Sequence, residues 1–168
     1  MSVIEVLLAS VLLMTCALGV IGLVSTSIAS NNRNKMDSTQ TMLAQSIIEQ
    51  IHATLIGSGT SALTDCAGTS WTIETAPGGA NLDASGAIDF TQTNTPANYY
   101  MNYAVNSPCQ SVAGQESTYD VRWHIDLVGA PSTPTNTYQI TVGARLLHSG
   151  PTGLIFSGPV TLKVLAGN

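Results

Sequence analysis

The feature that most constrains this chain is a long apolar run at its start. Residues 3–28 make up roughly 26 positions, enough for a helix to cross a bilayer, and Glu5 is the only charged residue before Arg33. A secretory signal peptide would begin with basic residues and have a shorter apolar core. An ionised group in a membrane helix costs roughly 2.5–3.5 kcal/mol. Glu5 is therefore expected to have a function, unless it only complements the dipole of the helix N-terminus near the membrane interface.

The helical pattern continues beyond residue 29 but becomes amphipathic. Its apolar positions recur at seven- and four-residue steps, at Met36, Leu43, Ile47, Ile51 and Leu55, with Ala44 and Ile48 beside them. The polar residues between them, Gln40 included, are assigned to the other sides of the helix. Gly57 and Gly59 are expected to end it. One helix from Ser2 to about Ile56 would be roughly 80 Å long.

The second half of the chain alternates apolar and polar residues, as half-buried antiparallel strands do. Long strands are predicted in residues 119–127, 138–146 and 154–165. Shorter strands are predicted around residues 69–75 and 99–105. Segments rich in Pro, Gly, Ser and Thr, at residues 129–137 and 149–153, are predicted loops, and Pro77-Gly78-Gly79 is a predicted turn.

These patterns predict an α+β fold. A long N-terminal helix with a hydrophobic first half would carry a small C-terminal antiparallel β-sheet head, in the shape of a lollipop. The predicted domains are residues 1–29, a hydrophobic helix suited to a membrane or a filament core, residues 30–56, an amphipathic half packed on the head, and residues 57–168, the β-rich head.

The first nine residues, Met-Ser-Val-Ile-Glu-Val-Leu-Leu-Ala, resemble the N-terminus of mature type IV pilins. In that family a hydrophobic residue, often Phe where this chain has Met1, begins the chain left by prepilin peptidase, and a Glu stands at the fifth position. The resemblance implies that the N-terminal amine of Met1, typically methylated, pairs with Glu5 of a neighbouring subunit in the filament core. An unpaired charge is costly in such a dry core. The later pattern Tyr-x-Val-x-Trp-x-Ile, from Tyr119, resembles PilV-type pilins, and it does not separate major from minor subunits.

The resemblance implies a structural subunit of an extracellular filament used for attachment, motility or DNA uptake. The implied partners are further copies of the chain, other pilins, prepilin peptidase and the assembly machinery. The chain would lie in the bacterial inner membrane before assembly and at the cell surface afterwards. Two alternatives are a type II secretion pseudopilin and a singly membrane-anchored periplasmic binding or sensor domain. The pseudopilin is disfavoured because major pseudopilins often hold a C-terminal calcium site, and the C-terminal segment here has no acidic cluster.

Two glycines, Gly19 and Gly22, interrupt the apolar helix. Glycine is about 1 kcal/mol less favourable than Ala in a helix interior. The pair could loosen the helix in the assembled filament, with Thr15 and Ser25 nearby to bond freed backbone groups. Close packing between helices through small residues explains them equally well.

Cys66 and Cys109 are predicted to form a disulfide, because Cys16 lies inside the apolar run and cannot meet them. The bond would close a loop of about 44 residues and contribute on the order of 4 kcal/mol in the chain-entropy model. The alternative is two free, buried thiols.

Other functions find little support in the sequence. The net charge is -5 and only five basic residues are scattered along the chain, so no specific nucleic-acid site is expected. The histidines, His52, His124 and His148, are isolated and lack metal-ligand spacing. No P-loop or nucleophile elbow occurs. The chain is therefore predicted to be no enzyme and to need no metal or cofactor.

Overall fold

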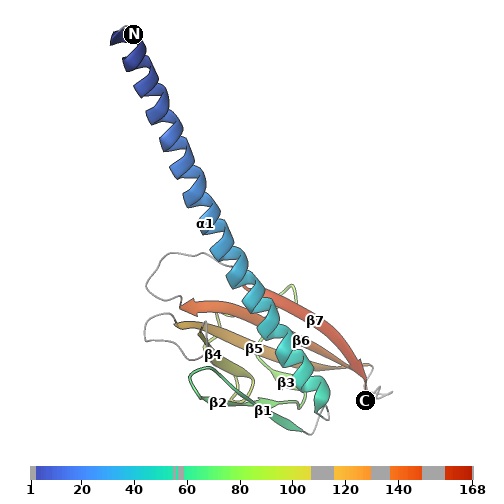
Figure 1. Ribbon diagram of the computed structural model, residues 1–168. Helices are drawn as coiled ribbons and strands as arrows, with labels where there is room; N and C mark the ends of the chain where they lie inside the picture. The colour runs from blue at the N-terminus through green and yellow to red at the C-terminus, as the bar shows by residue number, and fades with distance from the viewer. Residues whose placement is uncertain are drawn as a thin grey trace. The chain divides into compact units, whose positions relative to one another are not determined.

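The predicted long helix is present as α1, a single α-helix over Val3–Ala53 (Figure 1). The structure, a computed structural model, describes residues 3–54, 56, 59–106, 116–129, 137–148 and 158–167. The chain divides into two units, Met1–Lys35 and Met36–Asn168. The helix ends before the expected Ile56. The Thr54 hydroxyl donates to the Gln50 carbonyl (2.9 Å) and the Thr54 N–H donates to Ile51 (3.3 Å), so the last turn closes on itself.

The strands form two antiparallel sheets within the second unit. Their bounds are β1 Thr60–Thr64, β2 Ser70–Glu74, β3 Gly78–Gly79, β4 Tyr100–Asn106, β5 Glu116–Val128, β6 Thr137–His148 and β7 Val160–Gly167. Strands β1 and β2 pair only with each other among the described residues, and the other strands form a five-stranded sheet. These findings confirm the α+β class and its antiparallel sheet.

The long strand β5 organises the five-stranded sheet. One edge of β5 pairs with β6, which in turn pairs with β7. The other edge of β5 pairs with two strands, with β4 along the first part of β5 and with β3 at Ile125 and His124. Strands β5, β6 and β7 therefore form a meander, with β3 and β4 added at one side.

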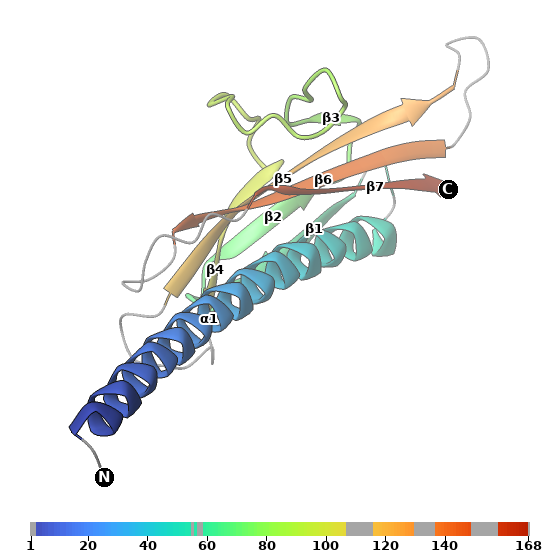
Figure 2. The same ribbon diagram turned by 90° about the horizontal axis from the view of Figure 1, so that it is seen from above.

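The core lies between the sheet and the C-terminal part of α1, as Figures 1 and 2 show. From α1 it takes Ala44, Ile47 and Ile51, all at most 1 % exposed, and their spacing follows the amphipathic pattern. From the sheet it takes a larger set of buried side chains: Met101, Tyr119, Val121, Trp123, Ile125, Ile140, Val142, Ala144 and Ala166. The assignment of Gln40 to an outer side of the helix was wrong. Gln40 precedes Ala44 by one turn on the same face and is fully buried.

The sheet face away from α1 is also partly covered. Ile88 is 4 % exposed and packs over Gly143, where an added Cβ would lie 2.8 Å from the Ile88 Cβ. Asp120 on the same face of β5 is only 3 % exposed. Figure 2 shows the loops that follow β3 on the side of the sheet away from α1. The sheet is thus packed on both faces.

The Gly78–Gly79 pair forms strand β3, so the prediction of a turn there was wrong. Both residues have positive φ, 124° and 126°, a region open to glycine but rarely to other residues. A Cβ on Gly79 would overlap the Trp123 carbonyl oxygen and approach the Tyr99 ring to 2.8 Å. Only glycine lets the backbone come this close to β5.

The remaining strand predictions differ from the structure mainly at their ends. The last strand, β7, runs from Val160 to Gly167 instead of residues 154–165, and Pro159, which has no N–H to donate, directly precedes it. Residues 154–157 and most of both predicted loops lie outside the described residues. Strand β1 was not predicted, because its sequence TSALT has a single large apolar residue.

Candidate functional site

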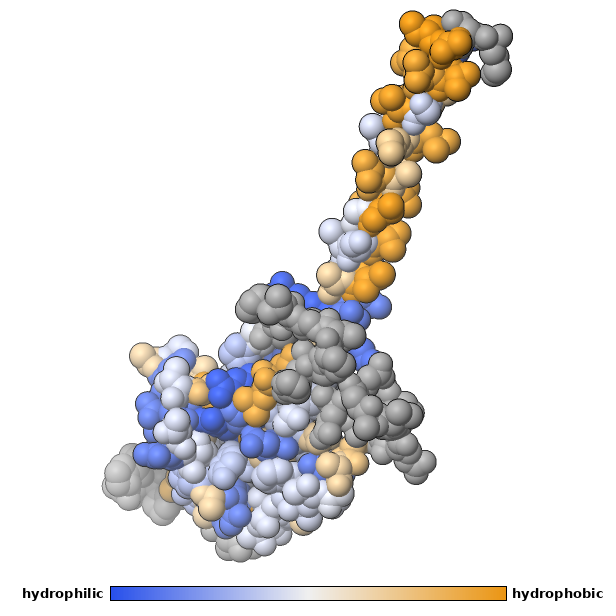
Figure 3. Space-filling view, turned by 90° about the vertical axis from the view of Figure 1, so that its left-hand side faces the viewer, coloured by the Kyte–Doolittle hydropathy of each residue, from blue (hydrophilic) through white to orange (hydrophobic). Residues whose placement is uncertain are grey.

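The first unit presents an apolar surface on every side of the helix. Each large apolar side chain between Val3 and Ile28 is 52–78 % exposed, and Figure 3 shows this apolar surface in orange. By length and composition α1 could cross a membrane, and none of its most apolar stretch is buried. Burying one such side chain is worth roughly 1.5–3 kcal/mol. The whole surface therefore requires lipid or protein around it.

Glu5 lies in the first turn of α1 and its residue is exposed. A carboxylate at this end complements the partial positive charge of the free backbone N–H groups. It also sets a charged group at one end of a surface that is otherwise uncharged as far as Ile28. Met1, whose amine is the predicted partner of Glu5 in a neighbouring chain, lies outside the described residues. The pairing stays a prediction.

The two glycines of the first unit lie within continuous helix. A Cβ at Gly19 or Gly22 would meet nothing within 4 Å, so the single chain does not require glycine at either position. Nearby hydroxyls already bond helix carbonyls: Ser25 donates to Ile21 (2.9 Å), and Thr26 donates to Gly22 (3.2 Å). Thr15, the other residue named in the loosening hypothesis, donates to the Leu12 carbonyl (2.9 Å), so these hydroxyls all bond within an unbroken helix. The behaviour of the glycines among packed helices remains a prediction.

The cysteines divide as the sequence suggested, as far as the structure describes them. Cys16 is a free cysteine and exposed on the apolar helix. Cys66 is disulfide-bonded and lies in the turn between β1 and β2. Its backbone N–H donates to the Ala104 carbonyl on β4 (3.2 Å). The predicted partner, Cys109, lies outside the described residues, so this pairing also stays a prediction.

An ionic cluster on the covered face of the sheet was missed by sequence reasoning. Both carboxylate oxygens of Asp120 accept hydrogen bonds from Arg122, at 2.9 Å each, and one of them lies 2.9 Å from Arg145. The two guanidinium groups also lie over the ring of Phe90, at 5.4 and 4.8 Å from its centroid. Arg122 further donates to the Gln92 carbonyl (2.7 Å). The cluster ties the loop around Phe90 to the sheet.

The same loop is held by two aspartates. The Ser85 side chain donates to Asp83 and lowers the pKa of that carboxyl, and the Thr91 side chain does the same for Asp89. Each carboxylate also accepts backbone N–H groups two or four residues further on, at 2.8–2.9 Å. These bonds shape turns, and one oxygen of each carboxylate accepts two or three of them.

The histidines occupy ordinary positions. His52 is exposed at the end of α1, and the side chain of His148 lies outside the described part of the chain. The ring nitrogens of His124 lie 2.7 Å from the Ala80 carbonyl and 2.9 Å from the Asp126 carboxylate. The first contact joins β5 to the residue that follows β3. Across the residues that the structure describes, no group of three or more His, Cys, Asp or Glu side chains could hold a metal ion.

The geometry therefore leaves two distinct surfaces. The first unit offers an apolar helix surface with one acid at its end, and the second offers a sheet domain in which Asp120, Arg122 and Arg145 bind one another. Comparisons of the chain with protein-family models, with curated proteins and with solved structures give no match.

Proposed function

We propose that this chain is a structural subunit of a type IV pilus-like extracellular filament that assembles through the first half of α1. One observation carries the proposal. A helix exposed and apolar on all sides, with one acid in its first turn, continues without a break into the helix that packs on a β-domain. A helix apolar all round must be enclosed by lipid or by other helices. In the proposed cycle it is enclosed by the inner membrane first and by neighbouring copies afterwards.

The proposed role of Glu5 is to set the register of assembly. Lipid near the headgroups leaves the carboxylate partly solvated, whereas a core of packed helices does not. The N-terminal amine of Met1 in the neighbouring chain would neutralise it there. Glu5 then acts as a docking group, with no catalytic role, and the filament would serve attachment, motility or DNA uptake at the cell surface.

The test replaces the only copy of this subunit with Glu5→Val. We expect a membrane-inserted, folded chain that enters no filament, measured by electron microscopy of sheared surface material and by immunoblots of the membrane and sheared fractions. Glu49→Val is the matched control, because Glu49 is an exposed acid on the same helix but lies in the second unit. This control should assemble normally.

Normal filaments built from the Glu5→Val chain alone would contradict the proposed docking role. If the wild-type chain itself never enters surface filaments, the filament proposal fails. A chain confined to the membrane would then favour the singly anchored domain. Loss of protein secretion on deletion of the chain would favour the secretion pseudopilin.

A further inference from the structure

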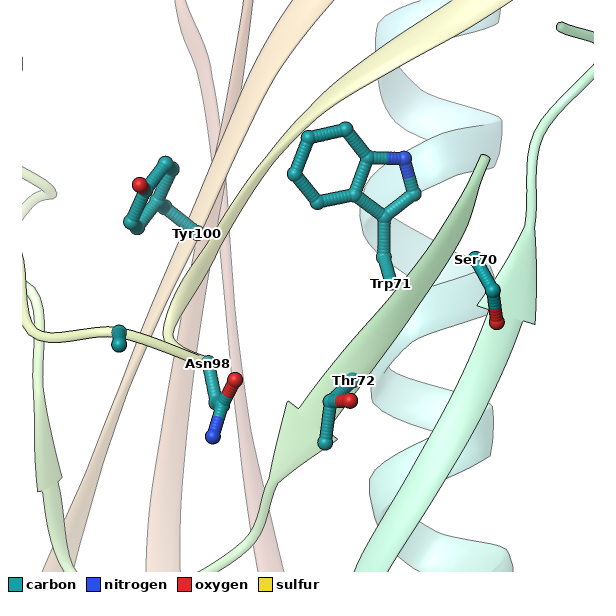
Figure 4. Close-up of a pocket in the computed structure, with 6 residues that line it drawn as sticks. Ser70, Trp71, Thr72, Asn98 and Tyr100 are labelled. Carbon is teal, nitrogen blue, oxygen red and sulfur yellow. The ribbon is translucent and has the colours of Figure 1, made fainter. Parts of the chain in front are cut away.

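A shallow hollow in the second unit combines two aromatic rings with unused polar groups. It has a volume of about 200 Å³ and is lined by Ser70, Trp71, Thr72, Ala97, Asn98 and Tyr100. Figure 4 shows the rings of Trp71 on β2 and Tyr100 on β4, with Asn98 and Thr72 below them in that view. The hollow thus lies between the edge of β2 and the segment that leads into β4.

The indole of Trp71 is fixed by an internal hydrogen bond. Its Nε1–H donates to Asp65 (3.0 Å), and the other oxygen of this buried carboxylate accepts the N–H groups of Ala67 and Thr69 (3.0 and 2.8 Å). Trp71 also packs against the hydrophobic core. Because its N–H is already used, the ring offers a ligand only an apolar surface, held in one orientation.

The opposite wall is fixed by the residue between Asn98 and Tyr100. Tyr99 is 8 % exposed, its hydroxyl donates to the Ala76 carbonyl (2.8 Å), and its ring lies beside Trp123. Asn98 has a φ of 67°, a conformation that few residues other than glycine adopt, and its carbonyl accepts the Glu74 N–H (3.0 Å). Burial of Tyr99 therefore leaves the neighbouring side chains of Asn98 and Tyr100 exposed.

The polar groups around the hollow are available to a ligand. Within the described part of the chain, no hydrogen bond uses the side-chain polar atoms of Ser70, Thr72, Asn98 or Tyr100. The Glu74 N–H points from β2 toward Asn98, and backbone groups alternate along an antiparallel strand, so those of Ser70 and Thr72 point the same way. The hollow therefore has hydroxyl, amide and backbone groups beside two rings.

The charge of the lining selects the class of ligand. All six lining residues are uncharged. The nearby carboxylates are engaged internally: Asp65 by Trp71, and Glu74 by the N–H groups of Thr75 and Ala76. A nucleobase site would pair its aromatic rings with cations for the phosphates. A peptide strand would need a longer free edge than β2 offers, because Asn98 already occupies the Glu74 N–H.

We propose that this hollow binds a neutral saccharide. A pyranose ring has an apolar C–H face, which suits the surface of an aromatic ring such as Trp71 or Tyr100, and a rim of hydroxyls, which suits the Asn98 amide and the Thr72 hydroxyl. The volume lies below the usual range for drug-sized ligands and suits one sugar ring. The inference does not depend on filament assembly.

The test titrates the full chain, in micelles of a zwitterionic detergent that contains no sugar, with lactose, maltotriose and triacetylchitotriose. Tryptophan emission reports on the hollow, because the chain has two tryptophans and Trp123 is fully buried. We expect a saturable change with at least one of these sugars, with a Kd of about 1 mM or tighter. Saturation-transfer NMR should place sugar C–H protons against aromatic protons of the protein.

Variants locate the binding. Asn98→Gly removes the amide and keeps a residue that tolerates the positive φ, so the fold is preserved, and Tyr100→Ser removes an exposed ring. Each should weaken binding about tenfold, which is about 1.4 kcal/mol. Thr72→Val should also weaken it, whereas Thr60→Val, at an exposed position on β1, should not.

Three results would overturn the inference. The first is no saturable response to any of the three sugars at about ten times the expected Kd. The second is unchanged binding by the Asn98→Gly variant, after thermal unfolding has verified that this variant is folded. The third is equal or tighter binding of a charged probe, sialyllactose or an oligothymidylate, because the ligand class would then be wrong.

Discussion

The division of α1 into an exposed part and a buried part predicts that one substitution destabilises the β-domain at one position and not at another. Ile47 is 1 % exposed and belongs to the core, whereas Ile21 is 62 % exposed in the first unit. Both are isoleucines within the same helix. Ile47→Ala should destabilise the β-domain, and Ile21→Ala should leave the stability of that domain unchanged.

The magnitude follows from the side chain that is lost. Ile47→Ala removes three carbon atoms from a buried site, a transfer loss of about 2.4 kcal/mol at about 0.8 kcal/mol per carbon. The cavity left among the buried side chains of α1 and the sheet adds a further cost, so the total should be about 3–4 kcal/mol. Helix propensity slightly offsets this loss of stability, because Ala favours helix over Ile by a few tenths of a kcal/mol at both positions.

The assay is urea unfolding of the full chain in detergent micelles, monitored by the emission of the fully buried Trp123. The free energy of unfolding should fall by about 3–4 kcal/mol for Ile47→Ala and change by less than about 0.5 kcal/mol for Ile21→Ala. A loss below about 1 kcal/mol for Ile47→Ala, or equal losses at the two positions, would refute the proposed division of the helix.

Three further effects follow from the structure, and a fourth from the proposed function. Asp120→Asn should lower the free energy of unfolding by about 3 kcal/mol, because two arginines lose their buried carboxylate; a loss under about 1 kcal/mol would contradict this. Burial raises the pKa of Tyr119 above 10.0, so the native state keeps a proton that the unfolded chain releases. The resulting stability is present below pH 10 and is lost as the pH rises through the raised pKa, and urea midpoints should show a weaker alkaline loss for Tyr119→Phe. Intact-mass analysis after alkylation without reductant should find one alkylated thiol, and two more would contradict a bond between Cys66 and Cys109. In the proposed filament, helical hydrogen bonds should lapse within residues 14–23, and a map with an unbroken helix there would assign the glycines to close packing.

The elements with a strong local pattern were predictable from the sequence. The helix followed from a continuous apolar run joined to a 3.6-residue pattern, and β5 and β6 followed from a period of two. The buried positions Ala44, Ile47 and Ile51 were assigned correctly for the same reason. Gln40 was not, because a polar residue on a buried face carries no periodic signal of its own.

The elements that depend on distant partners were not predictable. Strand β3 consists of two glycines, and it is a strand only because β5 lies beside it. Asp120 and Arg122 read as solvent-facing residues of β5, since their burial depends on a loop some thirty positions earlier and on Arg145 in the next strand. The hollow joins Trp71 to Asn98 across the gap between two strands, and no sequence spacing marks that pairing.

The apolar helix and its acid contribute differently to the proposed assembly. Contacts between large aliphatic side chains provide attraction but little discrimination, because helices displaced by one turn present a similar surface. A single charge adds the discrimination that these contacts lack. A displaced neighbour would leave Glu5 without its amine in a dry core, at a cost of several kcal/mol, whereas the correct neighbour removes the cost. One acid at the end of an apolar helix is therefore enough to select one register, and it can do so only if the rest of that surface is free of competing charges, as residues 6–32 are.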